Sequence, residues 1–477
     1  MSEENNFLSN SNLDTEDSAK EIRSKIIQLV KKYAEISHKK KDFTPGNSFV
    51  PTSGRVYDFD EIQMLTSASL DFWLTTGRFN HQFEKRLSEF VGINYVTTTN
   101  SGSSANLLAL SALTSDKLGN RSLKAGDEVI CVAASFPTTI NPIIQNNLIP
   151  VFVDIEFPTY NIDPKQIEDA ISEKTKAIML AHTLGNPFDL RKIMEISKEH
   201  NLWVVEDCCD ALGSKYDGKM VGTFGDVSTL SFYPAHHITM GEGGAVNISG
   251  SLKLKRPAES FRDWGRDCYC PSGKDNTCKK RFSWQLGELP EGYDHKFIYS
   301  HLGYNFKPLD IQAAIGRVQL KRLPAFIEAR KQNWEYLRNG LSGLEDYFEF
   351  ALPEHATSWI KNGFTWDDSG CRTDCSWFGF MLKVKAEAPF TKSELAQNLD
   401  QNKIGNRMLF GGNLLRQPAF IQLKKDRPES YRVVGNLNGA DQLMQQALFL
   451  GTYPGLNKEM LDYEIEVIHN FTKSCRS

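Results

Sequence analysis

The sequence lacks the features that define several classes of protein. No apolar run approaches the ~18 residues of a membrane-spanning helix, and residues 1–21 are polar and acidic where a signal peptide would be basic and then apolar. Neither sign of charge dominates, with 55 Lys and Arg against 59 Asp and Glu, so no strong field attracts nucleic acid or anionic membrane. We therefore expect a cytoplasmic protein with neither nucleic acid nor membrane as a partner.

Cysteine is also scarce for its length. Nine cysteines in 477 residues are too few for a disulfide scaffold, so a cluster of them in a reducing compartment points to a metal site. The composition, 40% hydrophobic and 24% charged, is ordinary for a globular protein. The length predicts one large and one smaller domain.

The chain divides into three parts. Residues 1–48 are expected to form a disordered tail and a helix, because apolar residues recur at helical spacing from Ile22 to Tyr33. In residues 49–319 short β-rich runs alternate with helical stretches, which predicts a large α/β cofactor-binding domain: a mostly parallel sheet with helices on both faces. A cysteine-rich insertion is expected at about 261–299. Residues 320–477 are expected to form a linking helix (320–341) and a small α+β domain. The expected strands are 95–98, 129–132, 150–153, 177–181, 203–205, 229–232 and 245–248.

Three segments carry candidate chemistry. The turn at 100–104 (Asn-Ser-Gly-Ser-Ser) offers hydroxyls and free N–H groups at a helix start, which suits a phosphate, although such turns more often only cap a helix. The strand ending in Glu206-Asp207 would bring Asp207 to the carboxyl edge of the sheet, where it could face a cationic ring nitrogen; a helix N-cap is the alternative. The glycine-dense segment 231–244 lets backbone approach a cofactor closely.

In this order and spacing, and together with segments 150–154, 160–164, 303–305 and 312–320, the chain resembles the sugar aminotransferase family of fold-type I pyridoxal-phosphate proteins. The resemblance runs from about residue 49 to the C-terminus and implies roles for six residues. Ser103, Ser104 and Ser231 would bind the cofactor phosphate, Phe136 would stack on the pyridine ring and Asp207 would pair with its nitrogen. Asn305 would reach the phosphate from the second subunit of a homodimer.

One position departs from that family. The sixth residue of the segment that begins at Ser231 is a lysine in its aminotransferases, where the amine binds the cofactor covalently; here it is His236. No nearby lysine is an obvious substitute. Imidazole can still act as a general base, since its unperturbed pKa of ~6.5 lies near working pH. The alternative is an inactive cofactor site.

Four cysteines form a second unusual pattern. Cys209 follows Asp207, and Cys268, Cys270 and Cys278 come about sixty residues later. Four thiolates suit a [2Fe-2S] cluster, and a four-cysteine zinc site is the chemical competitor. The pattern resembles the iron-sulfur signature of the 3-dehydrases of 3,6-dideoxysugar biosynthesis, the histidine-bearing, pyridoxamine-phosphate-dependent branch of the same family. Cys208 is interpreted as a small buried thiol.

This resemblance implies C3 dehydration of a nucleotide-linked 4-keto-6-deoxyhexose, with CDP-4-keto-6-deoxy-D-glucose as the expected substrate, in O-antigen lipopolysaccharide synthesis. The expected cofactors are pyridoxamine 5′-phosphate and a [2Fe-2S] cluster, supplied with electrons by a separate NADH-dependent iron-sulfur flavoprotein reductase. Asp210 and Tyr233 are assigned to the cofactor pocket. Arg407 is assigned to the sugar-nucleotide site, a helix-surface salt bridge being the alternative.

Two other functions stay open. One is a cluster-free 3-dehydratase of GDP-4-keto-6-deoxymannose, which also carries histidine in place of lysine. The other is a non-catalytic cofactor-binding module with a four-cysteine zinc site.

Overall fold

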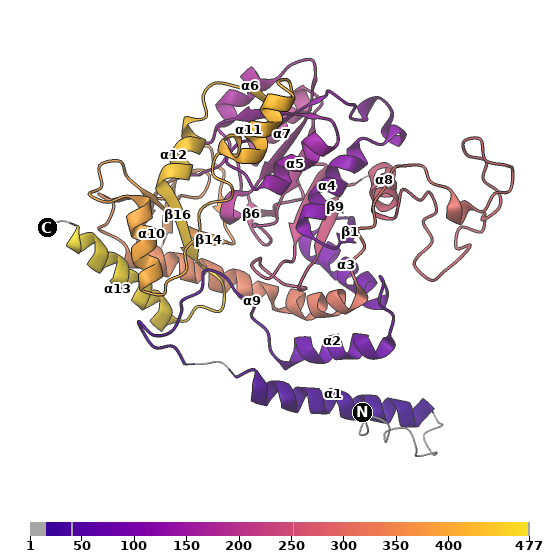
Figure 1. Ribbon diagram of the computed structural model, residues 1–477, viewed down its shortest axis with the longest axis horizontal. Helices are drawn as coiled ribbons and strands as arrows, with labels where there is room; N and C mark the ends of the chain where they lie inside the picture. Colours follow the sequence, from indigo (N-terminus) through magenta and orange to yellow (C-terminus); the bar gives the residue numbers. More distant parts are fainter. Residues whose placement is uncertain (1–15, 40–41, 251, 362, 476–477) are drawn as a thin grey trace.

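The computed structural model describes residues 16–39, 42–250, 252–361 and 363–475, and it is built around one large sheet (Figure 1). Eight strands lie in the order β1-β9-β8-β5-β4-β2-β3-β15. They are β1 Tyr95–Thr99, β2 Glu128–Val132, β3 Ile149–Val153, β4 Thr175–Ala181, β5 Trp203–Asp207, β8 Val227–Ser231, β9 Gly244–Ile248 and β15 Arg432–Val433. Neighbours from β8 to β15 are parallel, whereas β9 is antiparallel to β1 and β8. The sheet is mostly parallel, and every expected strand is present.

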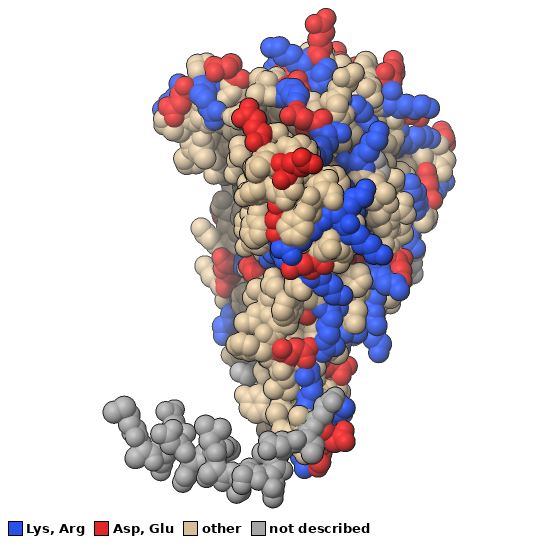
Figure 2. All heavy atoms as spheres, turned by 90° about the vertical axis from the view of Figure 1, so that its right-hand side faces the viewer, with Lys and Arg blue, Asp and Glu red and all other residues tan. Residues whose placement is uncertain are grey.

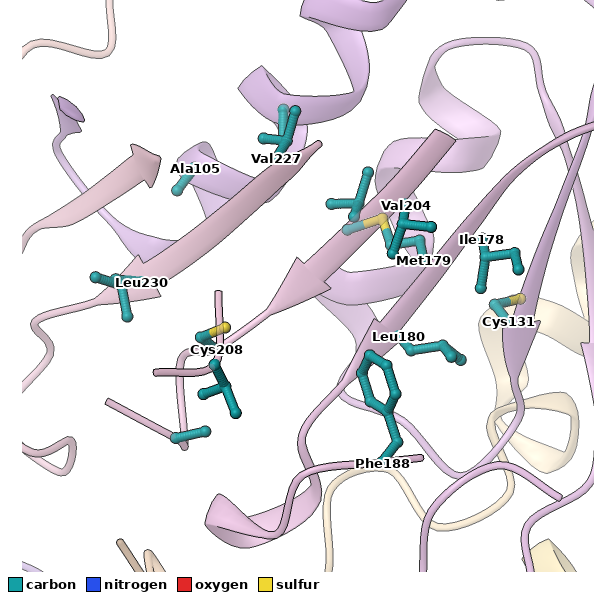
Figure 3. Close-up of a cluster of buried hydrophobic side chains, with 14 of the residues drawn as sticks. Ala105, Cys131, Ile178, Met179, Leu180, Phe188, Val204, Cys208, Val227 and Leu230 are labelled. Atoms are coloured by element: carbon teal, nitrogen blue, oxygen red, sulfur yellow. The ribbon is translucent and has the colours of Figure 1, made fainter. Parts of the chain in front are cut away.

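Helices from the same half of the chain cover this sheet. They are α3 Arg78–Val91, α4 Gly102–Leu113, α5 Pro137–Gln145, α7 Leu190–Glu199 and α8 Leu252–Arg262. The α4 helix packs on β8 and β9, and α5 packs on β3 and β4. Side chains such as Leu180, Val204, Val227 and Leu230 fill the core around the central strands (Figure 3). Strands that are covered by helices on both faces consist of continuous apolar residues, so they can be predicted from the sequence.

A second core lies around a three-stranded antiparallel sheet of order β10-β14-β16. Its elements are β10 Phe348–Phe350, β14 Gly379–Val384, β16 Ala447–Gly451, α10 Lys392–Gln401, α12 Asn438–Gln446 and α13 Lys458–Ser474. The long helix α9 (Asp310–Gly340) packs on α3 at one end and on α13 and β14 further along. The sequence places the start of this helix at residue 320. It begins ten residues earlier because the small buried side chains of Ala313 and Ala314 extend its packed face.

Apolar spacing also predicts helices at 84–90 and 164–171. The first is part of α3, which is longer, and the second is a 3-10 turn (Pro164–Gln166) followed by the single-turn helix α6 (Ile167–Ala170).

Segments distant in sequence join the two cores. The N–H of Val50 donates to the carbonyl of Lys403 at 2.8 Å, and Val50 is buried in the second core. Strand β15 comes from the C-terminal part of the chain but pairs with β3 at the edge of the large sheet. A strand of two residues has no readable periodicity, so the sequence did not predict it.

The N-terminal helix and the insertion lie outside the main body. Helix α1 (Glu16–Ser37) packs on α2 (Phe59–Asp71), where Arg23 pairs with Asp71 at 2.8 Å, while Leu29 on its outer face is 64% exposed. The tail expected at 1–15 falls outside the described residues. Among the residues that the structure describes, no helix is both long and apolar enough to span a membrane.

The insertion follows α8 and projects beyond the sheet (Figure 1). Figure 2 shows the molecule from this side: both signs of charge are present, with Lys and Arg denser along one edge. The base of the insertion touches the turn between α2 and α3, where the hydroxyls of Thr76 and Ser272 lie 2.9 Å apart.

Candidate active site

The centre of the candidate site is Asp207 at the carboxyl end of β5. Its side chain is buried, and its Oδ2 accepts hydrogen bonds from Asn106 Nδ2 on α4 and Thr139 Oγ1 on α5, both at 2.8 Å. Its Oδ1 accepts the N–H of Cys209 at 3.1 Å. The strand is followed by turns and the short strand β6 (Lys215–Tyr216), so Asp207 does not cap a helix. A buried carboxylate with a fixed orientation suits pairing with a cationic nitrogen.

The neighbouring acid, Glu206, has a structural role. Successive side chains of a strand point to opposite faces, and Glu206 accepts hydrogen bonds from the N–H groups of Gly222 and Gly225 and lies 3.1 Å from His182 Nε2. Burial alone would raise the pKa of this carboxyl, but His182 and the main-chain donors outweigh burial and lower it. Only one of the two acids therefore lies on the side of Asn106 and Thr139.

The expected phosphate loop lies beside Asp207. Ser101 caps α4 by accepting the N–H of Ser104 at 3.1 Å, and Ser103 in the first turn is exposed. Ser231 ends β8 next to this turn: a Cβ on Gly102 would lie 2.5 Å from the Cβ of Ser231, so only glycine allows this approach. The turn thus caps its helix and, through Gly102, lies directly against Ser231, so that Ser103, Ser104 and Ser231 all belong to segments around the first turn of α4.

His236 faces Asp210. Its Nδ1 lies 3.2 Å from Asp210 Oδ1, and both side chains are largely buried. The imidazole packs on Phe378, with ring centroids 5.3 Å apart, and Tyr233 lies at its other side, with centroids 6.5 Å apart and half of its surface exposed. Nδ1 of His236 and Oδ1 of Asp210 are close, although among the described residues Nδ1 forms no hydrogen bond; if Nδ1 pairs with this carboxylate, Nε2 is the nitrogen left to accept a proton.

Phe136 lies close to the segment that contains Arg407. Phe136 precedes α5, is 49% exposed, and its ring centroid is 6.4 Å from that of Phe410. Phe410 belongs to the segment that contains Arg407. The main chain of Arg407 forms an antiparallel β-bridge with Phe449, and its side chain donates from Nη1 to the carbonyl of Asn406 at 2.8 Å. Arg407 is exposed, outside any helix and, among the described residues, without an ion pair. The helix-surface salt bridge considered as its alternative role is therefore not found.

Asn305 is exposed on a turn that touches the phosphate loop of its own chain. The carbonyl of the next residue, Phe306, accepts the N–H of Asn100 at 2.7 Å. Large apolar side chains surround this turn, among them Leu302, which is 95% exposed, and Trp264. Exposed apolar groups of this size are typical of a surface that another molecule covers.

The structure brings three of the four expected metal-binding cysteines together. Cys268, Cys270 and Cys278 line one small hollow in the insertion, with Thr277 Oγ1 donating to Cys270 Sγ at 3.1 Å. Cys209 is not among the residues that line this hollow. Burial and the carboxylate of Asp207 raise the pKa of its thiol well above the ordinary value. Cys208 is buried in the large core (Figure 3), in line with its interpretation as a structural thiol.

Sequence reasoning missed Asn106 and Thr139, the two residues that orient Asp207. Asn106 did carry a signal, since it is a buried amide within the otherwise small and apolar helix α4. Thr139 carried none, because threonine is common in the first turn of a helix. The residues present fit pyridoxamine or pyridoxal phosphate: Asp207 suits its ring nitrogen, and the α4 turn with Ser231 suits its phosphate.

The chain is similar to known proteins of an aminotransferase family, which is consistent with a site for this cofactor. The model of the DegT/DnrJ/EryC1/StrS aminotransferase family matches residues 57–469. The chain is 56% identical to the lipopolysaccharide biosynthesis protein RfbH of Salmonella typhimurium, covering 95% of this chain and 98% of the relative. It is 47% identical to dTDP-4-dehydro-2,6-dideoxy-D-glucose 3-dehydratase of Saccharopolyspora spinosa, covering 94% and 92%.

Solved structures of related proteins have the same fold. The GDP-4-keto-6-deoxy-D-mannose-3-dehydratase of E. coli with bound hydrated PLP superposes with a TM-score of 0.75 at 29% identity, covering 88% of this chain and 99% of that one. The expected fold class, fold-type I, is confirmed by these matches.

Proposed function

Because the chain belongs to the DegT/DnrJ/EryC1/StrS aminotransferase family, we propose that it uses pyridoxamine phosphate to remove the C3 hydroxyl of a nucleotide-linked 4-keto-6-deoxyhexose. The observation that carries the proposal is His236, which stands at the family's lysine position and faces Asp210 at 3.2 Å. This arrangement can move a proton but cannot bind the cofactor covalently. The similarity to a named sugar-nucleotide 3-dehydratase supports it.

Each residue has a definite task in this proposal. The bound cofactor would supply an amine for the sugar ketone and a ring that takes up negative charge. Asp207, held by Asn106 and Thr139, would keep the ring nitrogen protonated. His236 would accept a proton at Nε2, with Asp210 orienting the imidazole through Nδ1. Ser103, Ser104 and Ser231 would hold the phosphate, Phe136 would cover the ring, Tyr233 would line the pocket and Arg407 would contact the sugar nucleotide.

The specific substrate we propose is CDP-4-keto-6-deoxy-D-glucose, which would place the enzyme in 3,6-dideoxysugar and O-antigen synthesis. The similarity to a protein named for lipopolysaccharide biosynthesis supports this assignment. The test is incubation of the pure protein and pyridoxamine phosphate with CDP-, GDP- and dTDP-linked 4-keto-6-deoxyhexoses, following C3 hydroxyl loss by mass spectrometry. Turnover of the GDP-linked mannose sugar alone would favour the cluster-free dehydratase instead.

Cys209, Cys268, Cys270 and Cys278 are proposed as ligands of a [2Fe-2S] cluster that accepts electrons from a separate NADH-dependent flavoprotein reductase. Three of them line one hollow, which supports a metal site there. After anaerobic purification, iron and sulfide assays and a visible spectrum should detect the cluster. Cys268→Ser should remove its absorption and Cys371→Ser, at a buried cysteine outside the hollow, should retain it. Zinc in place of iron would instead support the non-catalytic alternative.

A homodimer is proposed as the active form, with Asn305 reaching the phosphate of the partner's site. The exposed side chains of Leu302 and Trp264 beside Asn305 support an interface at this turn. Sedimentation should give twice the chain mass of 53.9 kDa, and Leu302→Glu should weaken both dimerisation and cofactor binding. A monomer with full cofactor occupancy would contradict this assignment.

A further inference from the structure

A buried arginine lies directly behind the catalytic histidine. Arg330, on α9, is 1% exposed, and its guanidinium donates hydrogen bonds to three main-chain carbonyls. Nη2 donates to His236 at 3.2 Å, while Nη1 donates to Trp377 at 3.2 Å and to Phe378 at 3.4 Å. One side chain therefore holds the main chain of His236 and the segment that leads into β14.

An ion pair does not explain why an arginine is buried at position 330. Within the described residues this arginine forms no salt bridge, and its Nε is buried without a hydrogen-bond partner. Burial lowers the pKa of the guanidinium to about 10, with the charge of Asp210 acting in the opposite direction. A buried cation without a close carboxylate costs stability, so an apolar residue would serve packing better at this position.

Two of the three carbonyls that Arg330 holds belong to His236 itself and to Phe378, its neighbour in space. Phe378, whose carbonyl Arg330 holds, packs its ring on the imidazole of His236. The neighbouring His237 is fixed as well, with Nε2 2.9 Å from the carbonyl of Ser376. The imidazole is thus held by its own main chain on one side and by Phe378 on the other, and this leaves Nδ1 opposite Asp210.

We propose that Arg330 is the positioning residue for His236: by tying the carbonyls of His236 and Phe378 to α9, it holds the imidazole in line with Asp210 and Nε2 toward the proton it accepts. This inference rests on the proposed function, because it assumes that His236 accepts the proton. A displacement of about 1 Å at a catalytic group can cost ~100-fold in rate. We therefore expect loss of Arg330 to reduce the rate of proton transfer and to leave cofactor binding intact.

The experiment compares Arg330→Gln and Arg330→Lys with a matched control on the same helix. Arg338 is also buried on α9 but bonds to Glu345 and packs on Phe350, away from His236. Three quantities are measured on each full-length protein: the dissociation constant for pyridoxamine phosphate, the thermal unfolding midpoint, and the sugar-dependent exchange of the cofactor C4′ proton with deuterium under saturating cofactor and sugar.

In Arg330→Gln we expect exchange to fall about 10- to 100-fold with cofactor affinity unchanged, and added guanidinium ion to restore part of the rate. Arg330→Lys should also be slow, because lysine lacks the planar fork whose two separate nitrogens reach the carbonyls of Phe378 and His236. Arg338→Gln should lower the unfolding midpoint and keep the exchange rate.

Two results would overturn the inference. One is a full exchange rate in either Arg330 variant; if Arg330→Gln does not fold, Arg330→Lys alone decides. The other is an equal loss of rate in the Arg338 variant, or a loss that follows cofactor affinity, since both indicate a general structural role. Absence of exchange in the wild-type protein, or full exchange in His236→Asn, would instead contradict the proposed function itself.

Discussion

A lysine at position 236 would place a primary amine next to Asp210, whereas the imidazole found there can transfer a proton but cannot hold an aldehyde cofactor covalently. The carboxylate of Asp210 lies 3.2 Å from Nδ1 of that imidazole, while the ring of Phe378 packs on it. At the scale of single residues, the replacement of lysine by histidine therefore changes which reaction the site can carry out.

We predict that the cofactor of the wild-type protein is bound without a covalent link. After borohydride reduction in the presence of pyridoxal phosphate, gel filtration should remove the cofactor from the wild-type chain, while His236→Lys should retain it. Intact-protein mass spectrometry measures the difference. A retained cofactor in the wild-type protein, mapped to any lysine, would show that another amine has taken over the lysine's role.

The start of α3 shows how one element depends on another. Its N-cap residue, Gly77, has no side chain with which to cap the helix. Asp310 at the start of α9 takes this role: its carboxylate accepts the N–H groups of Gly77 at 2.9 Å, Phe79 at 3.2 Å and Asn80 at 2.8 Å. A carboxylate at this end of a helix is also favoured by the helix dipole. The two helices are thus joined at the edge of the large domain.

Removal of this carboxylate should destabilise the protein. We expect Asp310→Ala to lower the free energy of unfolding by about 1–3 kcal/mol, because two buried donors and one partly buried donor lose their acceptor. Asp310→Asn, which keeps one acceptor oxygen, should lose less. Urea unfolding followed by circular dichroism measures both variants, and Asp346→Ala, at an exposed acid, serves as the control. Equal midpoints for Asp310→Ala and wild type would disprove the capping role.

For the molecule as a whole, a buried acid lies where the two cores meet. The carboxylate of Glu354 accepts a hydrogen bond from Asn161 Nδ2 at 3.2 Å, and its N–H donates to Asn186 Oδ1 at 2.9 Å. Burial raises the pKa of Glu354 to about 8, and nearby carboxylates such as Glu156 add to this effect. At neutral pH the folded protein therefore binds a proton that the unfolded chain releases.

This proton makes stability depend on pH. Folding raises the pKa of Glu354 from 4.5 to about 8. Below pH 4.5 its contribution to the free energy of unfolding is therefore constant. Between these two pKa values the contribution decreases as pH rises, by up to ~1.4 kcal/mol per pH unit. Glu354→Gln should remove this dependence, so the variant should melt at a higher temperature than wild type near pH 8 and at a similar one near pH 4. Calorimetry across this range tests it, with the exposed Glu387→Gln as control. A constant difference at all pH values would contradict the assignment.

The sequence by itself determined the large sheet, the order of its strands along the chain and the position of His236. Buried parallel strands are short apolar runs, and His236 became informative through the resemblance to a family that holds lysine at that position. The candidate site followed from the same local signals, since Asp207 ends a strand and Ser103 and Ser104 begin a helix.

Only the tertiary structure decided the contacts between distant segments. The orientation of Asp207 by Asn106 and Thr139, the edge strand β15, and the bonds of Arg330 to His236 join residues far apart in the chain, and no local pattern encodes them. The same holds for three of the four cysteines, because Cys268, Cys270 and Cys278 line one hollow that Cys209 does not line. Spacing along the chain reports local geometry, whereas these contacts depend on how helices and strands pack, which is set by the sum of many weak interactions.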